Sequence, residues 1–116
     1  MVFKLKKFNL YVRSMVRAMA VEVKMRYLGH DIARHFGSGK KRETVHLPDN
    51  AEYEHLLSLL EKRFKRAFEQ LYGRKPREKM LDTFIFIREG QTLRTIRDKL
   101  INPEREVLVA YADFGG

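Results

Sequence analysis

The stretch Val107-Leu108-Val109-Ala110-Tyr111-Ala112-Asp113-Phe114-Gly115-Gly116 decides the predicted fold. Its apolar first half predicts a strand, and a strand this late in the chain would place the two last glycines beside a sheet. Glycine has no Cβ and reaches backbone conformations closed to other residues, so a diglycine tail can enter a narrow slot. We therefore expect the α-carboxylate of Gly116 to be accessible to another protein's active site. Chain ends are also commonly frayed, so the remaining sequence must decide between these interpretations.

Composition limits the possible classes of protein. A chain of 116 residues fits one domain, and the absence of cysteine excludes disulfides and thiolate sites. No stretch approaches the roughly 18 apolar residues of a membrane span, so we expect a cytoplasmic protein. The net charge of +9 suggests nucleic acid as a partner. However, residues 1–42 carry eleven Lys and Arg against two acids, whereas residues 43–116 carry thirteen of each. The basic excess is therefore predicted to lie in the first 42 residues.

The amino-terminal segment, residues 1–18, carries five basic residues and no acid. Leu5, Phe8, Val12, Met15 and Met19 follow the three-four spacing of a helix face, but Phe8, Leu10 and Val12 also alternate as in a strand. The segment lacks the long apolar core and cleavage site of a secretory signal. We divide the chain into a basic extension, residues 1–18, which we expect to be dispensable for folding, and a folded domain, residues 19–116.

Within that domain the pattern predicts two strands, a helix and then further strands. Residues 19–27 alternate between apolar and mostly charged side chains, and residues 43–47 form a second strand of a hairpin, with a short helical piece near residues 31–36 between them. Asp49 and Glu52 have the spacing of a capping box, which predicts that a helix begins after Asp49. Gly73 is expected to end this helix. Its expected buried stripe, with a break near Phe64, is Tyr53, Leu56, Leu57, Leu60, Phe64, Ala67, Phe68 and Leu71.

Apolar residues 83–87 and 105–112 predict two more strands, whereas residues 92–101 fit either a short strand or a helical turn. One long helix and four or five strands pack most economically as a mixed sheet with the helix across one face. The first and last strands would then pair in the centre. This arrangement is an α+β fold of the β-grasp, or ubiquitin-like, type.

The sequence resembles the small subunit of molybdopterin synthase and, more broadly, the ubiquitin-like sulfur carriers. These include the thiamine-pathway carrier and the ubiquitin-related modifiers. The resemblance covers residues 19–116, and the diglycine end is its most specific part. Its other elements are residues 21–27, Ile32-Ala33-Arg34-His35-Phe36-Gly37, Val45-His46-Leu47-Pro48 and Leu56-Leu57-Ser58-Leu59-Leu60.

The resemblance implies a carrier protein rather than an enzyme. An ATP-dependent adenylating enzyme would activate the carboxylate of Gly116, with Gly115 beside it in the partner's active site, and sulfur would then replace an oxygen to give a thiocarboxylate. No bound cofactor is implied. The large subunit of molybdopterin synthase is a possible second partner. Sulfur donation in molybdopterin biosynthesis is the favoured role; a thiamine or tRNA-thiolation carrier, or a protein modifier joined through Gly116, stays open.

A partner surface is expected on the sheet face that the helix does not cover. The third and last strands are apolar on both faces, so one set of their residues must point away from the helix. That set is exposed unless the long helix, the residue 80–81 segment or the amino-terminal extension covers it. Exposed apolar patches usually mark interfaces. The residues expected to bind the partner are Phe84, Phe86, Ile87, Val107, Val109, Tyr111 and Phe114.

Other functional sites find less support in the sequence. His30, His35, His46 and His55 lack the spacing of metal ligands, and no phosphate-binding glycine loop or nucleophile motif occurs. The alternative to a carrier, from a different class of protein, is a nucleic-acid-binding module. It would rest on Phe3, Phe8 and Tyr11 among the amino-terminal lysines. We favour the carrier.

Overall fold

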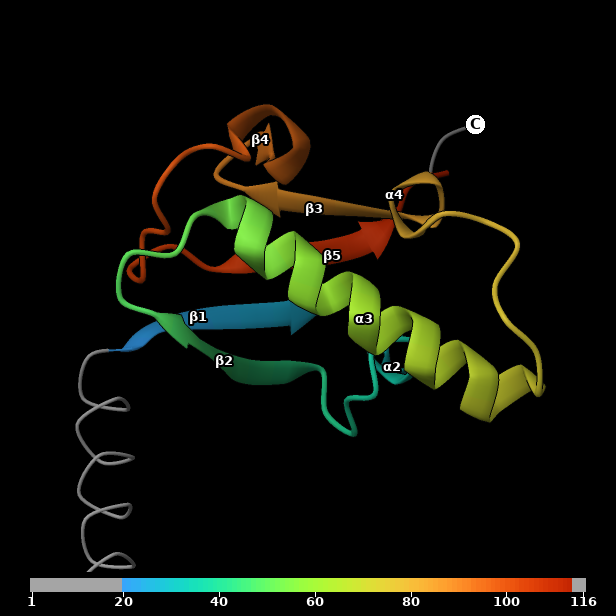
Figure 1. Cartoon of the computed structure of the whole chain (residues 1–116). Helices are drawn as coiled ribbons and strands as arrows, with labels where there is room; N and C mark the ends of the chain where they lie inside the picture. The colour runs from blue at the N-terminus through green and yellow to red at the C-terminus, as the bar shows by residue number, and fades with distance from the viewer. Residues whose placement is uncertain (1–19, 114–116) are drawn as a thin grey trace, which may run out of the picture.

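The computed structural model describes residues 20–113, so the amino-terminal extension and the diglycine lie outside the described residues. Figure 1 shows a sheet crossed by one long helix. The elements, in chain order, are β1 (Ala20–Tyr27), α2 (His30–Arg34), β2 (Arg42–Pro48), α3 (Tyr53–Tyr72), α4 (Met80–Thr83), β3 (Phe84–Arg88), β4 (Gln91–Thr92), the 3₁₀ helix η1 (Leu93–Ile96) and β5 (Val107–Tyr111).

The five strands form one mixed sheet in the order β2-β1-β5-β3-β4. β1 and β2 form the predicted antiparallel hairpin, with α2 in the connection between them. β1 also pairs in parallel with β5, so Met25 lies opposite Val107. β3 pairs antiparallel with the other side of β5. The predicted central pairing of the first and last strands is therefore confirmed, and this topology is that of a β-grasp fold.

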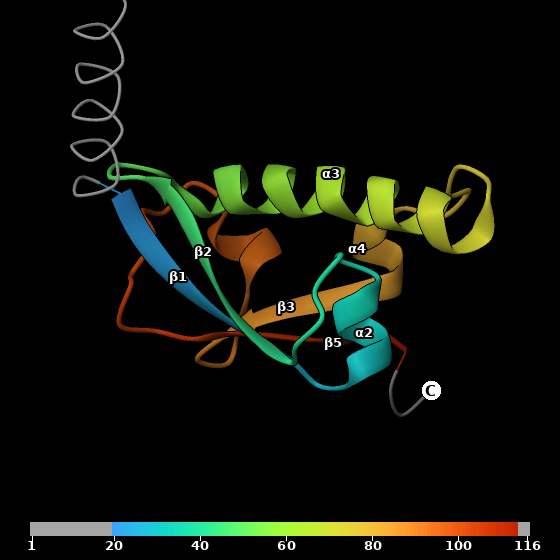
Figure 2. The ribbon, with the colours of Figure 1, turned by 90° about the horizontal axis from the view of Figure 1, so that it is seen from below.

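Helix α3 lies across one face of this sheet, as Figure 2 shows from below. It runs unbroken for 20 residues, so the expected break near Phe64 is wrong. Gly73 ends the helix with φ 68°, a left-handed conformation that suits a residue without a Cβ. The expected apolar stripe lies against the sheet, except that Leu71 is exposed because the last turn of the helix extends past the core.

The start of α3 differs from the prediction. Glu52, not Asp49, is the N-cap, and it forms a capping box with His55, whose Nδ1 accepts a 2.9 Å hydrogen bond from the Glu52 backbone N–H. The residues before it form a turn closed by Ala51 N–H and the Pro48 carbonyl. Ala51 then accepts a hydrogen bond from the Ile101 N–H, which keeps this part of the chain out of the helix.

The structure settles the one ambiguous stretch and shortens one predicted strand. Residues 92–101 contain both a short strand and a helical turn, because β4 ends at Thr92 and η1 follows at once. β5 is shorter than the predicted strand over residues 105–112, since its pairing partners extend only from Val107 to Tyr111.

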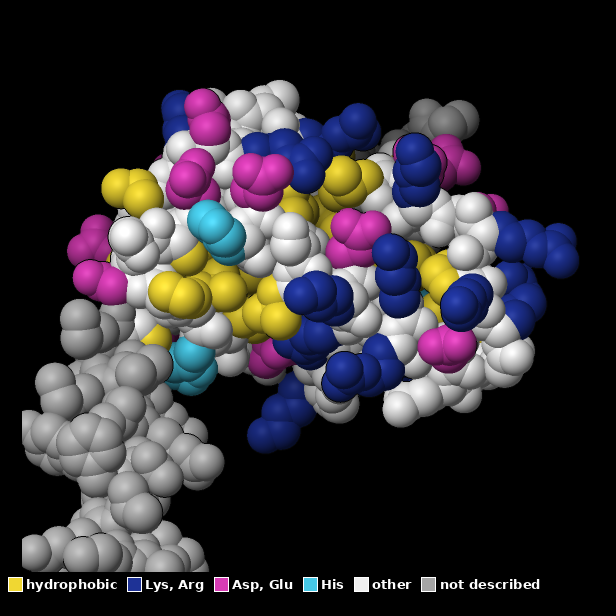
Figure 3. Space-filling model, viewed as in Figure 1, with side chains coloured by type: hydrophobic (Ala, Val, Ile, Leu, Met, Phe, Trp, Pro, Cys, Tyr) yellow, Lys and Arg dark blue, Asp and Glu magenta, His cyan; other side chains and the backbone are white. Residues whose placement is uncertain are grey.

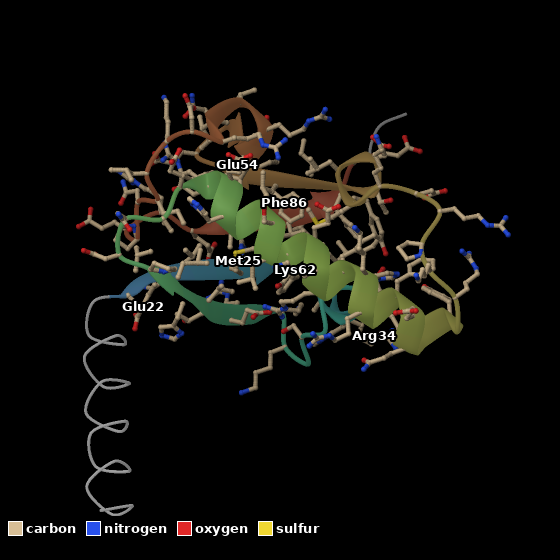
Figure 4. All side chains as sticks on the ribbon, in the orientation of Figure 1. Glu22, Met25, Arg34, Glu54, Lys62 and Phe86 are labelled. Atoms are coloured by element: carbon tan, nitrogen blue, oxygen red, sulfur yellow. The ribbon has the colours of Figure 1, made fainter. Side chains whose placement is uncertain are left out.

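The hydrophobic core lies between α3 and the sheet, and Met25 and Phe86 mark it in Figure 4. Phe36, just after α2, is fully buried and lies at its centre. Its ring packs against those of Tyr27, Phe64, Phe84 and Phe86, with centroid separations of 5.7, 6.1, 5.0 and 5.7 Å. This one side chain therefore joins α2 to strands β1 and β3 and to helix α3.

A bidentate ion pair joins β2 to α3 beside this core. Arg63 donates to both carboxylate oxygens of Glu43 at 2.7 and 2.9 Å, and the Tyr27 hydroxyl donates to the same carboxylate at 2.8 Å. Partial burial opposes ionisation of Glu43. The hydrogen bonds from Arg63 and Tyr27 outweigh that burial, so the pKa of Glu43 lies below its usual value of 4.5.

We expect Glu43→Gln to lower the free energy of unfolding by roughly 1.5–3 kcal/mol at pH 7, because it removes a charged acceptor of three hydrogen bonds. The depressed pKa means that the carboxylate stabilises the fold above pH 4.5 and loses this effect as the pH falls through its folded value. The difference between the two proteins in urea unfolding should therefore shrink below pH 4.5. The exposed Glu61, paired with Lys65 at 3.3 Å, provides a control. Glu61→Gln should cost less than about 0.5 kcal/mol, and a Glu43→Gln deficit that persists at low pH would refute the assignment.

Candidate functional site

The candidate site begins where β5 leaves the sheet. β5 is the central strand and is held on one side by β1 and on the other by β3. One residue beyond the strand, the Ala112 N–H still donates a 2.9 Å hydrogen bond to the Thr83 carbonyl. Figures 1 and 2 place this end of β5 near α2 and α4. The backbone is thus fixed up to Ala112, and the remaining sequence is Asp113, Phe114, Gly115 and Gly116.

Tyr111 anchors the end of β5 to α2. Its ring stacks on Phe84, with centroids 5.4 Å apart, and its hydroxyl donates a 2.5 Å hydrogen bond to Asp31 Oδ2. That bond lowers the pKa of the Asp31 carboxyl. It is also the largest cause of the raised pKa of Tyr111, about 12, to which burial contributes less. Both groups keep their bonded forms, carboxylate and phenol, across the physiological pH range.

His35 extends this anchor to the end of α3. Its Nδ1 lies 2.7 Å from the Asp31 carbonyl oxygen, and because a carbonyl can only accept, Nδ1 carries the proton. In the neutral ring Nε2 then accepts a hydrogen bond from the Tyr72 hydroxyl, 3.0 Å away. In the sequence His35 only lacks the spacing of a metal ligand, and nothing near it indicates this cluster. Tyr111 and Asp31 are 80 residues apart, so no local pattern could reveal their contact.

Four of the residues expected to bind a partner are instead in the core. Phe84, Phe86, Val107 and Val109 are each at most 2% exposed. They share the sheet face that α3 covers, because Phe86 lies opposite Val109 and side chains alternate along each strand. Their assignment to a partner surface is therefore wrong. Phe114 lies outside the described residues.

The opposite face of the sheet carries a smaller apolar patch. We call Ile85, Ile87, Leu108 and Ala110 the outer patch. The register pairs Ile85 with Ala110 and Ile87 with Leu108, so the four residues are contiguous across β3 and β5. Ile85, Ile87 and Leu108 are half-buried, and Ala110 is buried. Of the described helices, the long one lies on the other face (Figure 2). Ile87 is thus placed on the expected face, and Tyr111 is 38% exposed at the edge of the core.

Metal or membrane sites find no support in the described part of the chain. Residues 20–113 hold no group of three or more His, Asp or Glu arranged to bind a metal ion. No helix among them is long and apolar enough to cross a membrane.

Comparison with known proteins bears on the fold. No protein-family model matches the chain. No curated protein matches it either. Among solved structures, the chain is similar to the crystal structure of SAMP1 from Haloferax volcanii, with a TM-score of 0.51 and 17% identity over 82% of this chain and 99% of that one. It is also similar to the solution structure of the small archaeal modifier protein 1 (SAMP1) from Methanosarcina acetivorans, with a TM-score of 0.48 and 17% identity over 84% and 98%. At this identity the Haloferax volcanii match establishes the fold alone. The chain has the ubiquitin-like β-grasp fold predicted from its sequence.

Proposed function

We propose that this protein is a ubiquitin-like sulfur carrier whose Gly116 carboxyl group is activated by an ATP-dependent adenylating enzyme. The observation that carries this proposal is the position of the diglycine, which begins four residues after Tyr111, the end of the central strand. The base of this tail is held by the pairing of β5 with β1 and β3 and by the hydrogen bonds from Tyr111 to Asp31 and from Ala112 to Thr83. A partner that holds the sheet would therefore receive the tail in a defined direction.

The proposed chemistry makes the carboxylate of Gly116 electrophilic. The carboxylate attacks the α-phosphate of ATP, releasing pyrophosphate and forming an acyl-adenylate. Hydrosulfide delivered by a partner then attacks the acyl carbon, AMP leaves, and a thiocarboxylate remains. The acyl-adenylate must be kept from water until sulfur arrives, which the enclosed pocket of an adenylating enzyme does. Glycines at positions 115 and 116 suit such a pocket because they add no side chain.

The sulfur acceptor that we propose is the molybdopterin precursor, as the resemblance to the molybdopterin synthase small subunit suggests. The second partner would then be the large subunit of that synthase. A second candidate function is protein modification, in which a lysine amine attacks the activated Gly116 and forms an amide. The SAMP1 name of the Haloferax volcanii structure supports this candidate.

Intact-mass measurement of the protein isolated from its native cell tests the proposal. The mass identifies the carboxyl-terminal residue and the group that it carries. A shift equal to the exchange of one oxygen for sulfur supports the carrier, and Gly116 found in an amide link to lysine supports the modifier. A carboxyl terminus that is neither sulfurated nor conjugated, and that a candidate adenylating enzyme does not activate in the presence of ATP, would contradict both.

We also propose that the outer patch is where the adenylating enzyme holds the domain, because it lies on β5, the strand that leads into the tail, and on its neighbour β3. Ile87→Asp should weaken binding to that enzyme by at least about tenfold, or ~1.4 kcal/mol, since a charge would replace an apolar contact. A titration measures the affinity, with circular dichroism to verify folding. Leu71→Asp is the matched control, because Leu71 is 44% exposed on α3 and the substitution adds the same charge. Equal effects of the two substitutions would place the interface elsewhere.

A further inference from the structure

The folded domain separates its charges along α3. Residues 62–79 carry eight Lys and Arg against two Glu, a net charge of +6. The rest of residues 43–116 carries five Lys and Arg against eleven Asp and Glu, a net charge of −6. Figure 3 shows the basic side chains gathered over the carboxyl-terminal half of α3 and the loop after it. The net excess does lie in the first 42 residues, but the balanced total for residues 43–116 hides a strongly basic surface.

Most of these basic side chains are available to a ligand. We call Lys62, Arg66, Arg74, Lys75, Arg77 and Lys79 the basic surface. All six are exposed, and none of them forms a salt bridge within residues 20–113. Two other basic residues of the segment are already paired: Arg63 with Glu43 and Lys65 with Glu61. A row of exposed charges is often only a solvated helix face, so a second feature has to identify a ligand.

That second feature is a cleft between α3 and the loop that follows it. Its volume of about 390 Å³ falls in the roughly 300–1,000 Å³ range of ligand pockets. Its lining combines apolar and charged groups: His35, Phe64, Phe68, Arg74, Arg77, Glu78 and Thr83. The Arg74 guanidinium lies 5.0 Å from the centre of the Phe68 ring. The one acid of the cleft, Glu78, accepts a 3.4 Å hydrogen bond from the Thr83 hydroxyl.

An exposed aromatic ring lies next to this cleft. The ring of Tyr72 is 4.5 Å from that of Phe68 between centroids, and Tyr72 is 52% exposed. Its hydroxyl is held by His35 Nε2 at 3.0 Å, which fixes the orientation of the ring. A fixed aromatic ring among unpaired cations provides both contacts that single-stranded nucleic acid uses, a face on which a base can stack and charges for the phosphates.

We propose that the basic surface, the cleft and Tyr72 bind single-stranded nucleic acid. Single strands fit better than a duplex, whose base faces are stacked and not available to Tyr72. An acidic polypeptide would form ion pairs with the lysines and arginines, but it would not stack on the exposed ring of Tyr72. This proposal does not depend on activation of Gly116.

Fluorescence anisotropy of the full-length protein with a short labelled RNA, and a DNA of the same sequence, tests the charges. Arg74→Gln/Arg77→Gln should weaken binding at least about tenfold at low salt. The dependence of log K on log salt should lose about 1.4 in slope, because each phosphate contact contributes about 0.7 in single strands. The matched control is Arg97→Gln/Lys99→Gln, which removes the same charge beside the amino-terminal end of α3, where the backbone carbonyls of both residues accept hydrogen bonds from the helix. Equal weakening by both pairs would overturn the proposal. So would loss of binding only in Lys6→Gln/Lys7→Gln, since these residues belong to the amino-terminal basic block.

Substitution of Tyr72 separates nucleic acid from an acidic protein as the partner. Tyr72→Ala keeps the charge and should weaken RNA binding at least about fivefold, because stacking on the ring is lost. Tyr72→Phe keeps the ring and should bind RNA almost as tightly as the unaltered protein does. This variant distinguishes the contribution of the ring from that of its hydrogen bond to His35. Thermal melting verifies that each variant is folded. If Tyr72→Ala binds RNA normally, or if polyglutamate binds as tightly as RNA, the proposal is wrong.

Discussion

Deletion of Gly115 and Gly116 should abolish formation of the acyl-adenylate and leave the thermal unfolding transition unchanged. The hydrophobic core of the described residues runs from Val21 to Val109, so the deletion removes none of its members. The last backbone hydrogen bond described at this end of the chain, from Ala112 to Thr83, is also kept. The reacting carboxyl group would move to Phe114, whose bulky side chain does not suit a slot made for glycine.

The measurement is exchange of labelled pyrophosphate into ATP by the purified adenylating enzyme, with each carrier variant as substrate. Replacement of both glycines by alanine is the matched control, because it keeps the length and the carboxylate and adds only two methyl groups. We expect this variant to react more slowly than the unaltered protein, whereas the deletion should not react. Equal activation of the deletion and the full chain would show that Gly116 is not the reacting residue.

The order of elements could be predicted from the sequence because each leaves a local pattern. The alternation from Val21 to Tyr27 indicates a strand with one covered face. Gly73 indicates the end of a helix, because the residue there adopts a left-handed conformation. The central pairing of β1 with β5 followed from the number of elements that one sheet and one helix must accommodate.

The two faces of β3 and β5 could not be told apart in this way. Both faces are apolar, so the alternation that identifies the covered side of β1 carries no information there. The aromatic residues of β3, Phe84 and Phe86, face α3 because they pack around Phe36, a contact between segments nearly 50 residues apart. The less bulky Ile85 and Ile87 are left on the outer face. Only the three-dimensional position of α2 reveals this choice.

The basic surface could not be predicted from the charge totals of the sequence. The total charge of residues 43–116 is zero, yet eight of their thirteen basic residues lie within residues 62–79, in α3 and the loop after it. Lys62 and Glu54, labelled in Figure 4, lie two turns apart on α3 and illustrate the change along its length. A partner is attracted to local charge within about one Debye length, ~8 Å at physiological salt, so the local value is the one that matters.

The second large effect is expected from Phe36→Ala, which should lower the free energy of unfolding by about 3–5 kcal/mol. Phe36 is 0% exposed and contacts four aromatic rings, so removal of its ring leaves a cavity that rigid neighbours cannot fill. Domains are commonly stable by only about 5–15 kcal/mol, so this loss is a large share of the total. Helix α2 has only five residues and depends on such packing, since helices this short are unstable alone.

Urea unfolding measures the loss, and two variants serve as controls. Phe36→Leu keeps most of the apolar volume and should cost less than Phe36→Ala. Leu71→Ala removes an exposed side chain from α3 and should change the stability by no more than about 0.5 kcal/mol. Because Asp31 lies in α2, a displaced helix should also release the hydrogen bond of Tyr111, whose pKa would fall from about 12 toward 10. A Phe36→Ala protein that keeps its stability, with Tyr111 still titrating near 12, would show that other residues hold α2 against the sheet.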